Sequence, residues 1–110
     1  MIINYYTTVG GKNLILETLN HLEVNKRAEA YYILNLIEDH GIEALNTLNT
    51  RKIHQKVYEL KFGQSRIFYL LMDKENIYLL HMCKKQKQKT EQNDRMLAIK
   101  RSKELGGKRG

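Results

Sequence analysis

The sequence of 110 residues contains no proline and no tryptophan, and its only cysteine is Cys83. A single cysteine excludes an internal disulfide and any zinc cluster built from several cysteines. Long apolar runs are also missing: the longest aliphatic and aromatic run, residues 67–72, is far shorter than the roughly 20 residues of a membrane-spanning helix. Polar residues between Asn4 and Lys12 interrupt any apolar core of a signal peptide. We therefore expect a cytoplasmic protein that makes no contact with a membrane.

The composition is that of a globular domain. Hydrophobic residues make up 42% and charged residues 28% of the chain, which is typical of a folded protein rather than a disordered one. A chain of this length buries about two-thirds of the surface that its unfolded form exposes, which suffices for a core of its own. No linker, repeat or low-complexity segment divides it. We expect residues 1–105 to form one domain and residues 106–110 to be a flexible basic tail.

The net charge of +7 is confined to the last quarter of the chain. Residues 1–83 contain nine Lys or Arg and nine Asp or Glu, whereas residues 84–110 contain ten Lys or Arg and three Asp or Glu. One basic end on a neutral domain indicates a polyanionic partner, because each neutralised phosphate releases condensed counterions. The alternative is a solvated tail that only aids solubility.

Hydrophobic spacing predicts two helices in the first half of the chain. Apolar residues over 14–22 and again over 26–40 recur at the i, i+3, i+4, i+7 positions of a helix with one buried face. Gly41 is expected to end the second helix, because glycine adopts a positive φ at little cost. A further helical turn over 42–48 leads into a polar stretch over 46–52.

The second half has the pattern of β-strands. Residues 57–62, 66–72 and 77–83 are β-prone and are separated by short turns, so they predict an antiparallel meander. Residues 2–6 add a short β-prone segment, and residues 92–104 predict a short helix. The expected fold class is α+β, with two N-terminal helices packed on one face of an antiparallel sheet and a short C-terminal helix.

Several kinds of catalytic site find no support in the residues. The β half offers only Glu59, Asp73 and Glu75, which is too few carboxylates for a two-metal nuclease, and no glycine-rich phosphate loop is present. No metal site and no cofactor are therefore expected. Cys83 and His81 share one strand face but lack a third group to orient them, so Cys83 is interpreted as a core thiol.

Basic residues offer a different chemistry. Lys61 and Arg66 flank a tight turn, and His81 is followed closely by Lys84 and Lys85, so strands that pair in order place this set on one sheet surface. A metal-free ribonuclease requires such a set: a group that takes the proton of the 2′-OH, cations beside the phosphoryl group, and a proton donor for the 5′-oxygen. A guanidinium fork binds two phosphate oxygens, and histidine is the side chain that ordinarily titrates near neutrality.

Each of the two most informative residues also has a purely structural interpretation. Arg66 has Glu59 and Asp73 within reach as salt-bridge partners on neighbouring strands and turns. His81 fits equally well as a hydrogen-bonded core histidine. The spacing of the residues leaves both alternatives open.

Four short motifs connect these residues to a known family. They read, in chain order, Tyr58-Glu59-Leu60-Lys61, Arg66-Ile67-Phe68-Tyr69, Leu79-Leu80-His81 and Gln88-Lys89-Thr90. In this order and spacing they resemble the RelE/HigB superfamily of toxins, and most of all its phage-derived HigB-like branch. The resemblance extends over residues 2–104 in element order and implies helices on an antiparallel sheet.

The resemblance also implies a function. Members are mostly toxins of type II toxin–antitoxin systems that cleave mRNA in the ribosomal A site and so inhibit translation. The implied partners are the ribosome, the mRNA and a cognate antitoxin, often a helix-turn-helix protein. By this match Arg66 contacts the scissile phosphate, with Lys61, His81 and Lys85 as the other catalytic residues. The matching residues that are expected to bind RNA are Lys84, Lys87 and Lys89. The variant Arg66→Ala is expected to lose activity and keep its fold.

The chain departs from the family pattern at four positions. Lys61 replaces an arginine and so loses a bidentate phosphate contact; Cys83 replaces a phenylalanine, Gln86 a lysine and Glu91 a proline. Three other function classes therefore stay open. They are a non-catalytic nucleic-acid-binding module, a toxin of the same fold that acts on another target such as DNA gyrase, and a small interaction protein with a solvated tail.

Overall fold

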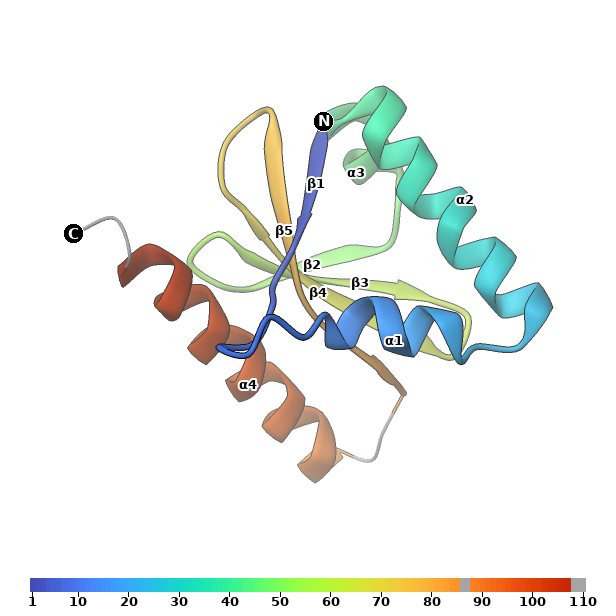
Figure 1. Cartoon of the computed structure of the whole chain (residues 1–110). Helices are drawn as coiled ribbons and strands as arrows, with labels where there is room; N and C mark the ends of the chain where they lie inside the picture. Colours follow the sequence, from blue (N-terminus) through green and yellow to red (C-terminus); the bar gives the residue numbers. More distant parts are fainter. Residues whose placement is uncertain (86–87, 108–110) are drawn as a thin grey trace.

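In the computed structural model of the chain, the described residues are 1–85 and 88–107, with side chains described up to residue 85 and from residue 91 to 106. Four helices and five strands occur in these residues (Figure 1). In chain order they are β1 (Ile2–Tyr5), α1 (Leu14–Asn20), α2 (Val24–His40), α3 (Ile42–Thr47), β2 (Thr50–His54), β3 (Val57–Phe62), β4 (Ser65–Leu71), β5 (Asn76–Lys84) and α4 (Gln88–Gly107).

The strands form one mixed sheet in the order β1-β5-β4-β3-β2. The predicted meander is confirmed, since β3, β4 and β5 pair antiparallel in sequence order. Two features were not predicted. Strand β2 extends the meander at one edge through antiparallel pairing with β3, and β1 closes the other edge by pairing parallel with β5. The sheet is therefore mixed rather than purely antiparallel.

Helices α1, α2 and α3 cover one face of the sheet. Ile15 and Leu19 of α1 and Ile33 and Ile37 of α2 are buried in one core with apolar residues of β3, β4 and β5. Gly41 ends α2 with a positive φ of 58° and donates its N–H to the Ile37 carbonyl, as the sequence predicted. These helices pack on the sheet because each buries an apolar stripe that cannot face water.

Helix α4 corrects the predicted arrangement of helices. The helical turn predicted over 42–48 is helix α3, so three helices precede the meander. Helix α4 has 20 residues and is longer than the short helix predicted over 92–104. It packs on the opposite face of the sheet, where Ala98 is fully buried beside Phe68 and Leu80. The physical reason is that this second face also carries large apolar side chains, which need a cover. The helix continues through Gly106, where the tail was expected to begin, and residues 108–110 lie outside the described residues.

No helix of the described residues combines the length and the apolar character that crossing a membrane requires.

Candidate active site

The register of the sheet collects the predicted catalytic residues on the face that α4 covers. Lys61 lies directly opposite Arg66, and Arg66 lies opposite Cys83. Two pairs further along the ladder, Phe68 lies opposite His81. Residues opposite one another in an antiparallel pair project to the same side of the sheet. The expectation that Lys61, Arg66 and His81 share one sheet surface therefore matches the geometry.

Three of the predicted cations line one small hollow at the end of the β3–β4 hairpin. The hollow has a volume of about 170 Å³. Its lining residues are Asn49, Lys61, Phe62, Gly63, Ser65, Arg66 and Lys85. Lys85 reaches this place because its N–H donates to the Gln64 carbonyl at 2.7 Å, which holds the end of β5 against the hairpin turn. The hollow thus brings Lys61, Arg66 and Lys85 together, and cations gathered at a concave surface attract anions.

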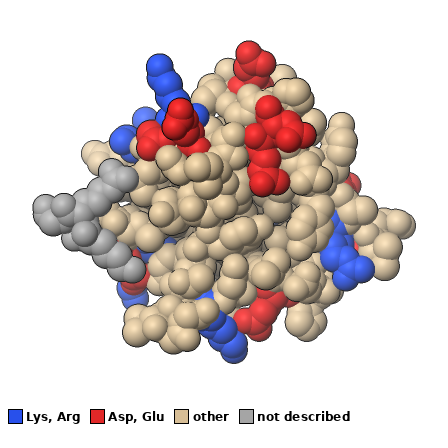
Figure 2. Space-filling view, turned by 45° about the horizontal axis from the view of Figure 1, so that its top comes forward, with Lys and Arg blue, Asp and Glu red and all other residues tan. Residues whose placement is uncertain are grey.

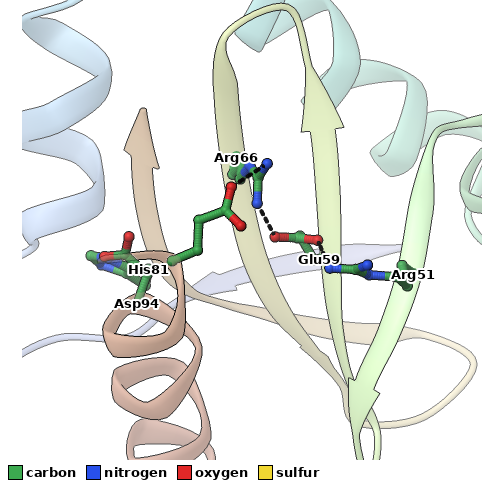
Figure 3. Close-up of polar contacts among 6 residues, drawn as sticks. Arg51, Glu59, Arg66, His81 and Asp94 are labelled. Carbon is green, nitrogen blue, oxygen red and sulfur yellow. Dashed lines mark hydrogen bonds and ion pairs between the residues drawn. The ribbon is translucent and has the colours of Figure 1, made fainter. Parts of the chain in front are cut away.

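Arg66 is the most constrained of these cations. Its side chain is only 7% exposed and lies between two carboxylates, with Nη1 2.9 Å from Oε2 of Glu59 and Nη2 2.7 Å from Oε1 of Glu91. Glu59 is fully buried and also accepts a hydrogen bond from Nη2 of Arg51 at 3.0 Å. Figure 3 shows Arg51, Glu59 and Arg66 in a row across the strands. The salt bridge to Glu59, weighed from the sequence, is thus formed.

The opposite charges in the row Arg51, Glu59, Arg66 and Glu91 neutralise one another. Two arginines and two glutamates alternate from β2 to α4, so each buried charge has an opposite neighbour. Removing one partner of a buried ion pair costs about 3–5 kcal/mol, because the other charge is left in a poorly solvated place. Arg66→Ala is therefore a poor test of catalysis alone, contrary to the expectation that it leaves folding intact.

His81 is held by α4 rather than by the hollow. Its Nε2 lies 2.8 Å from Oδ1 of Asp94, and its ring stacks on Phe68 with centroids 6.0 Å apart. His81 and Asp94 lie together where α4 passes β5 (Figure 3). A carboxylate in this position fixes the orientation of the imidazole ring. The hydrogen-bonded state weighed from the sequence is therefore present, on a histidine that stays 18% exposed.

Cys83 behaves as the core thiol that the sequence predicted. It is half-buried and packs against the core beneath α4. Burial first, and then the nearby carboxylate of Asp94, raise the pKa of its thiol to about 12. The thiol is therefore protonated at neutral pH, and a protonated thiol is a poor nucleophile.

The remaining predicted RNA-binding residues are only partly described. Lys84 and Lys85 are exposed at the end of β5, whereas Lys87 and the side chain of Lys89 lie outside the described residues. In the view of Figure 2, Lys and Arg side chains are scattered at the rim, with Asp and Glu groups between them and a broad uncharged area in the middle. The described residues of that face therefore offer no continuous cationic surface to a polyanion.

Sequence reasoning missed the contributions of α4 and β2 to this site. Glu91 was noted only as a replacement for a proline of the family pattern, and Asp94 and Arg51 carried no signal that linked them to Arg66 or His81. Their contacts are tertiary, between segments that lie 13 or more residues apart in the case of α4. Only the position of α4 on the sheet reveals them.

Comparison with known proteins agrees with the motif-based resemblance. A family model described as "Phage derived protein Gp49-like (DUF891)" matches residues 17–103. The match runs from α1 to α4 and so includes every described residue of the site. No curated protein matches the chain.

Proposed function

The chain belongs to the Gp49-like family of phage-derived proteins, a RelE/HigB-like family associated with toxin–antitoxin systems, and from this membership we propose that it is the toxin of a type II toxin–antitoxin pair. Its proposed activity is cleavage of mRNA in the ribosomal A site without a catalytic metal, and its proposed partners are the ribosome, the mRNA and an antitoxin. We place it in the cytoplasm, where translation takes place.

The observation that supports this proposal most strongly is the hollow at the β3–β4 hairpin. Lys61, Arg66 and Lys85 converge there from three strands or strand ends. A phosphodiester carries one negative charge that increases as the 2′-oxygen attacks, and preorganised cations stabilise that increase. The ribosome would supply what the hollow lacks, namely an mRNA whose 2′-OH is aligned with the adjacent phosphate.

The proton transfers fall to His81 in this proposal. Asp94 holds its ring in one orientation through the contact with Nε2. Such a histidine removes a proton from the 2′-OH or donates one to the 5′-oxygen. It lies on the same sheet face as Arg66, two residue pairs further along the ladder.

Substrate access requires a change at α4. Arg66 cannot bind a phosphate while Glu91 occupies one side of its guanidinium. Glu91 is 18% exposed and belongs to the first turns of α4, whereas Glu59 is fully buried in the sheet. We propose that the scissile phosphate displaces the Glu91 carboxylate, while Glu59 keeps the guanidinium in place from the opposite side. Glu91 then acts as an internal stand-in for the phosphate.

The test is a translation reaction with purified protein and a defined message, in which 5′ ends of the mRNA are mapped with and without ribosomes. The proposal predicts cuts within codons that appear only on translated message. An intact message would reject the nuclease, and binding of the protein to RNA without cleavage would then favour the non-catalytic module. Inhibition of DNA gyrase is the matching assay for the third class.

A further inference from the structure

Three potential metal ligands meet between β5 and α4. His81 and Cys83 lie two residues apart on β5, so they project to the same side of the strand. Asp94 comes from α4, which crosses that side. Among the described residues these side chains form the one group of three whose nitrogen, sulfur and oxygen donors all lie within 4.8 Å of one another.

The donor set matches the preferences of zinc. Zn²⁺ binds thiolate sulfur at about 2.3 Å and imidazole nitrogen or carboxylate oxygen at about 2.0–2.2 Å, in tetrahedral geometry. Donor atoms in such a site lie roughly 3.3–3.8 Å apart, so Nε2 of His81 and Oδ1 of Asp94, which are 2.8 Å apart, need to separate by about 0.5–1 Å. Any pair of donors near the 4.8 Å limit needs to close by about 1–1.5 Å. We propose that His81, Cys83 and Asp94 bind a Zn²⁺ ion, with water in the fourth position.

The surroundings are compatible with a bound cation. The side chains of His81 and Asp94 are 18% and 17% exposed, which leaves the ion a path from solvent and shields it once bound. Arg66 lies opposite Cys83 on the sheet, and its charge is offset by Glu59 and Glu91. One thiolate and one carboxylate together balance the charge of the ion.

Binding replaces existing contacts by stronger ones. Without an ion, His81 and Asp94 already touch at 2.8 Å, so two of the three ligands are positioned in advance. The zinc–sulfur bond forms as the Cys83 S–H bond breaks and its proton leaves to water, a proton that burial makes hard to remove because it raises the pKa of this thiol. The ion would then link β5 to α4 directly.

The site was not foreseeable from the sequence. His81 and Cys83 form a short H-x-C pattern, but the third donor belongs to a helix whose place on the sheet has no local signal. The ion takes no part in the cleavage proposed above. A consequence that does rest on the proposed function is that zinc bound to His81 would compete with the proton transfer assigned to this residue.

The experiment uses Co²⁺ as a spectroscopic probe of the metal-free full-length protein. The proposal predicts one equivalent of Co²⁺ bound with a sulfur-to-cobalt charge-transfer band and the visible bands of a tetrahedral ion, and displacement by Zn²⁺. Cys83→Ser should abolish the charge-transfer band, and Asp94→Asn should weaken binding at least tenfold. His40→Gln, which changes an exposed histidine at the end of α2, is the matched control and should bind normally.

Circular dichroism of each variant establishes that it is folded. A folded wild-type protein without the charge-transfer band would overturn the proposal, as would a band that persists in Cys83→Ser or an unchanged affinity in Asp94→Asn. The experiment measures the absorption of the bound metal, so its result does not depend on whether the protein cleaves mRNA.

Discussion

At the scale of single residues, Arg66 has a structural role and a proposed catalytic role, and each requires its guanidinium group. It belongs to a buried row of charges that holds β2, β3, β4 and α4 together. It is also the cation best suited to grip a phosphate, because its planar fork binds two oxygens at once. The structure reconciles the two tasks by giving Arg66 one fixed partner, Glu59, and one accessible partner, Glu91.

The variant Glu91→Ala tests whether Glu91 competes with substrate. Removing the carboxylate leaves one side of Arg66 free, so half-maximal cleavage should need about three- to tenfold less programmed ribosome, a change of up to about 1.4 kcal/mol. The measurement is the dependence of the cleavage rate on ribosome concentration. Glu43→Ala on α3 removes an exposed carboxylate on the other face and serves as the control. An unchanged or higher ribosome requirement in Glu91→Ala would contradict the displacement.

The burial of Tyr69 leads us to expect that the free energy of unfolding decreases at alkaline pH. It is 2% exposed and stacks on Tyr58 with centroids 5.4 Å apart, and burial raises its pKa from 10.0 to about 12. Between these values the unfolded chain loses a proton that the folded chain keeps, so the free energy of unfolding falls as pH rises from 10 to 12.

Urea unfolding at a series of pH values measures this effect. The fall should be smaller in Tyr69→Phe, which keeps the packed ring and has no proton to lose. Tyr32→Phe on the exposed side of α2 is the matched control and should fall like the wild type. Equal slopes in Tyr69→Phe and wild type would refute the assignment.

At the scale of elements, helix α4 controls the access of a substrate to the proposed active site. It brings Glu91 and Asp94 to the sheet, and its far half is fastened by Arg101. The Arg101 guanidinium donates to the Leu80 carbonyl at 2.8 Å and lies 4.8 Å from the centre of the Tyr6 ring. The ladder between β4 and β5 shifts register beside Leu80, which frees this carbonyl from the regular pairing.

The variant Arg101→Ala should therefore loosen α4. Loss of a charge-assisted hydrogen bond to a carbonyl that has left the ladder is expected to lower the free energy of unfolding by about 1–2 kcal/mol. Hydrogen exchange should show the largest loss of protection in α4 itself. Lys103→Ala removes an exposed cation from the same helix as a control. Equal protection of α4 in Arg101→Ala and wild type would show that this contact does not hold the helix.

The elements differ in how far the sequence determines them. The β3–β5 meander follows from short turns and alternation, because neighbouring strands pair through local contacts. Strand β2 was missed because Arg51, Lys52 and His54 are exposed at the sheet edge and leave no apolar alternation. The parallel pairing of β1 with β5 joins segments more than 70 residues apart, which no local pattern specifies.

In the proposed active site, too, the local contacts could be predicted from the sequence and the long-range contacts could not. Lys61 and Arg66 were predicted to approach because the hairpin between them is local, and they lie directly opposite one another. Glu91 and Asp94 were not predicted to lie near these residues. The position of α4 along the sheet depends on how Ala98 packs against it, and the sequence of the helix alone does not specify that packing. The basic residues of the site could therefore be predicted from the sequence, whereas the carboxylates that pair with them become evident only in the folded structure.

At the scale of the whole molecule, the excess of positive charge predicts salt-dependent association. A protein that neutralises phosphates binds more weakly as salt rises, because the release of condensed counterions into a more concentrated salt solution gains less entropy. Lys84→Gln with Lys85→Gln should reduce the slope of log affinity against log salt by about 1–2 in magnitude. The measurement is ribosome binding across a salt series, and Lys12→Gln with Lys26→Gln is the control, at exposed positions away from the site. An equal slope in the two double variants would contradict a role for the basic end.

The most direct test of the proposed active site is the single-turnover rate of mRNA cleavage on programmed ribosomes. Lys61 and Lys85 lie at the rim of the hollow and outside the buried row of charges, so replacing either by alanine spares the core. If these cations stabilise the transition state, Lys61→Ala and Lys85→Ala should each cut roughly a hundredfold more slowly than the wild type, while Lys26→Ala keeps the full rate. Cleavage at the wild-type rate in both variants would contradict the account.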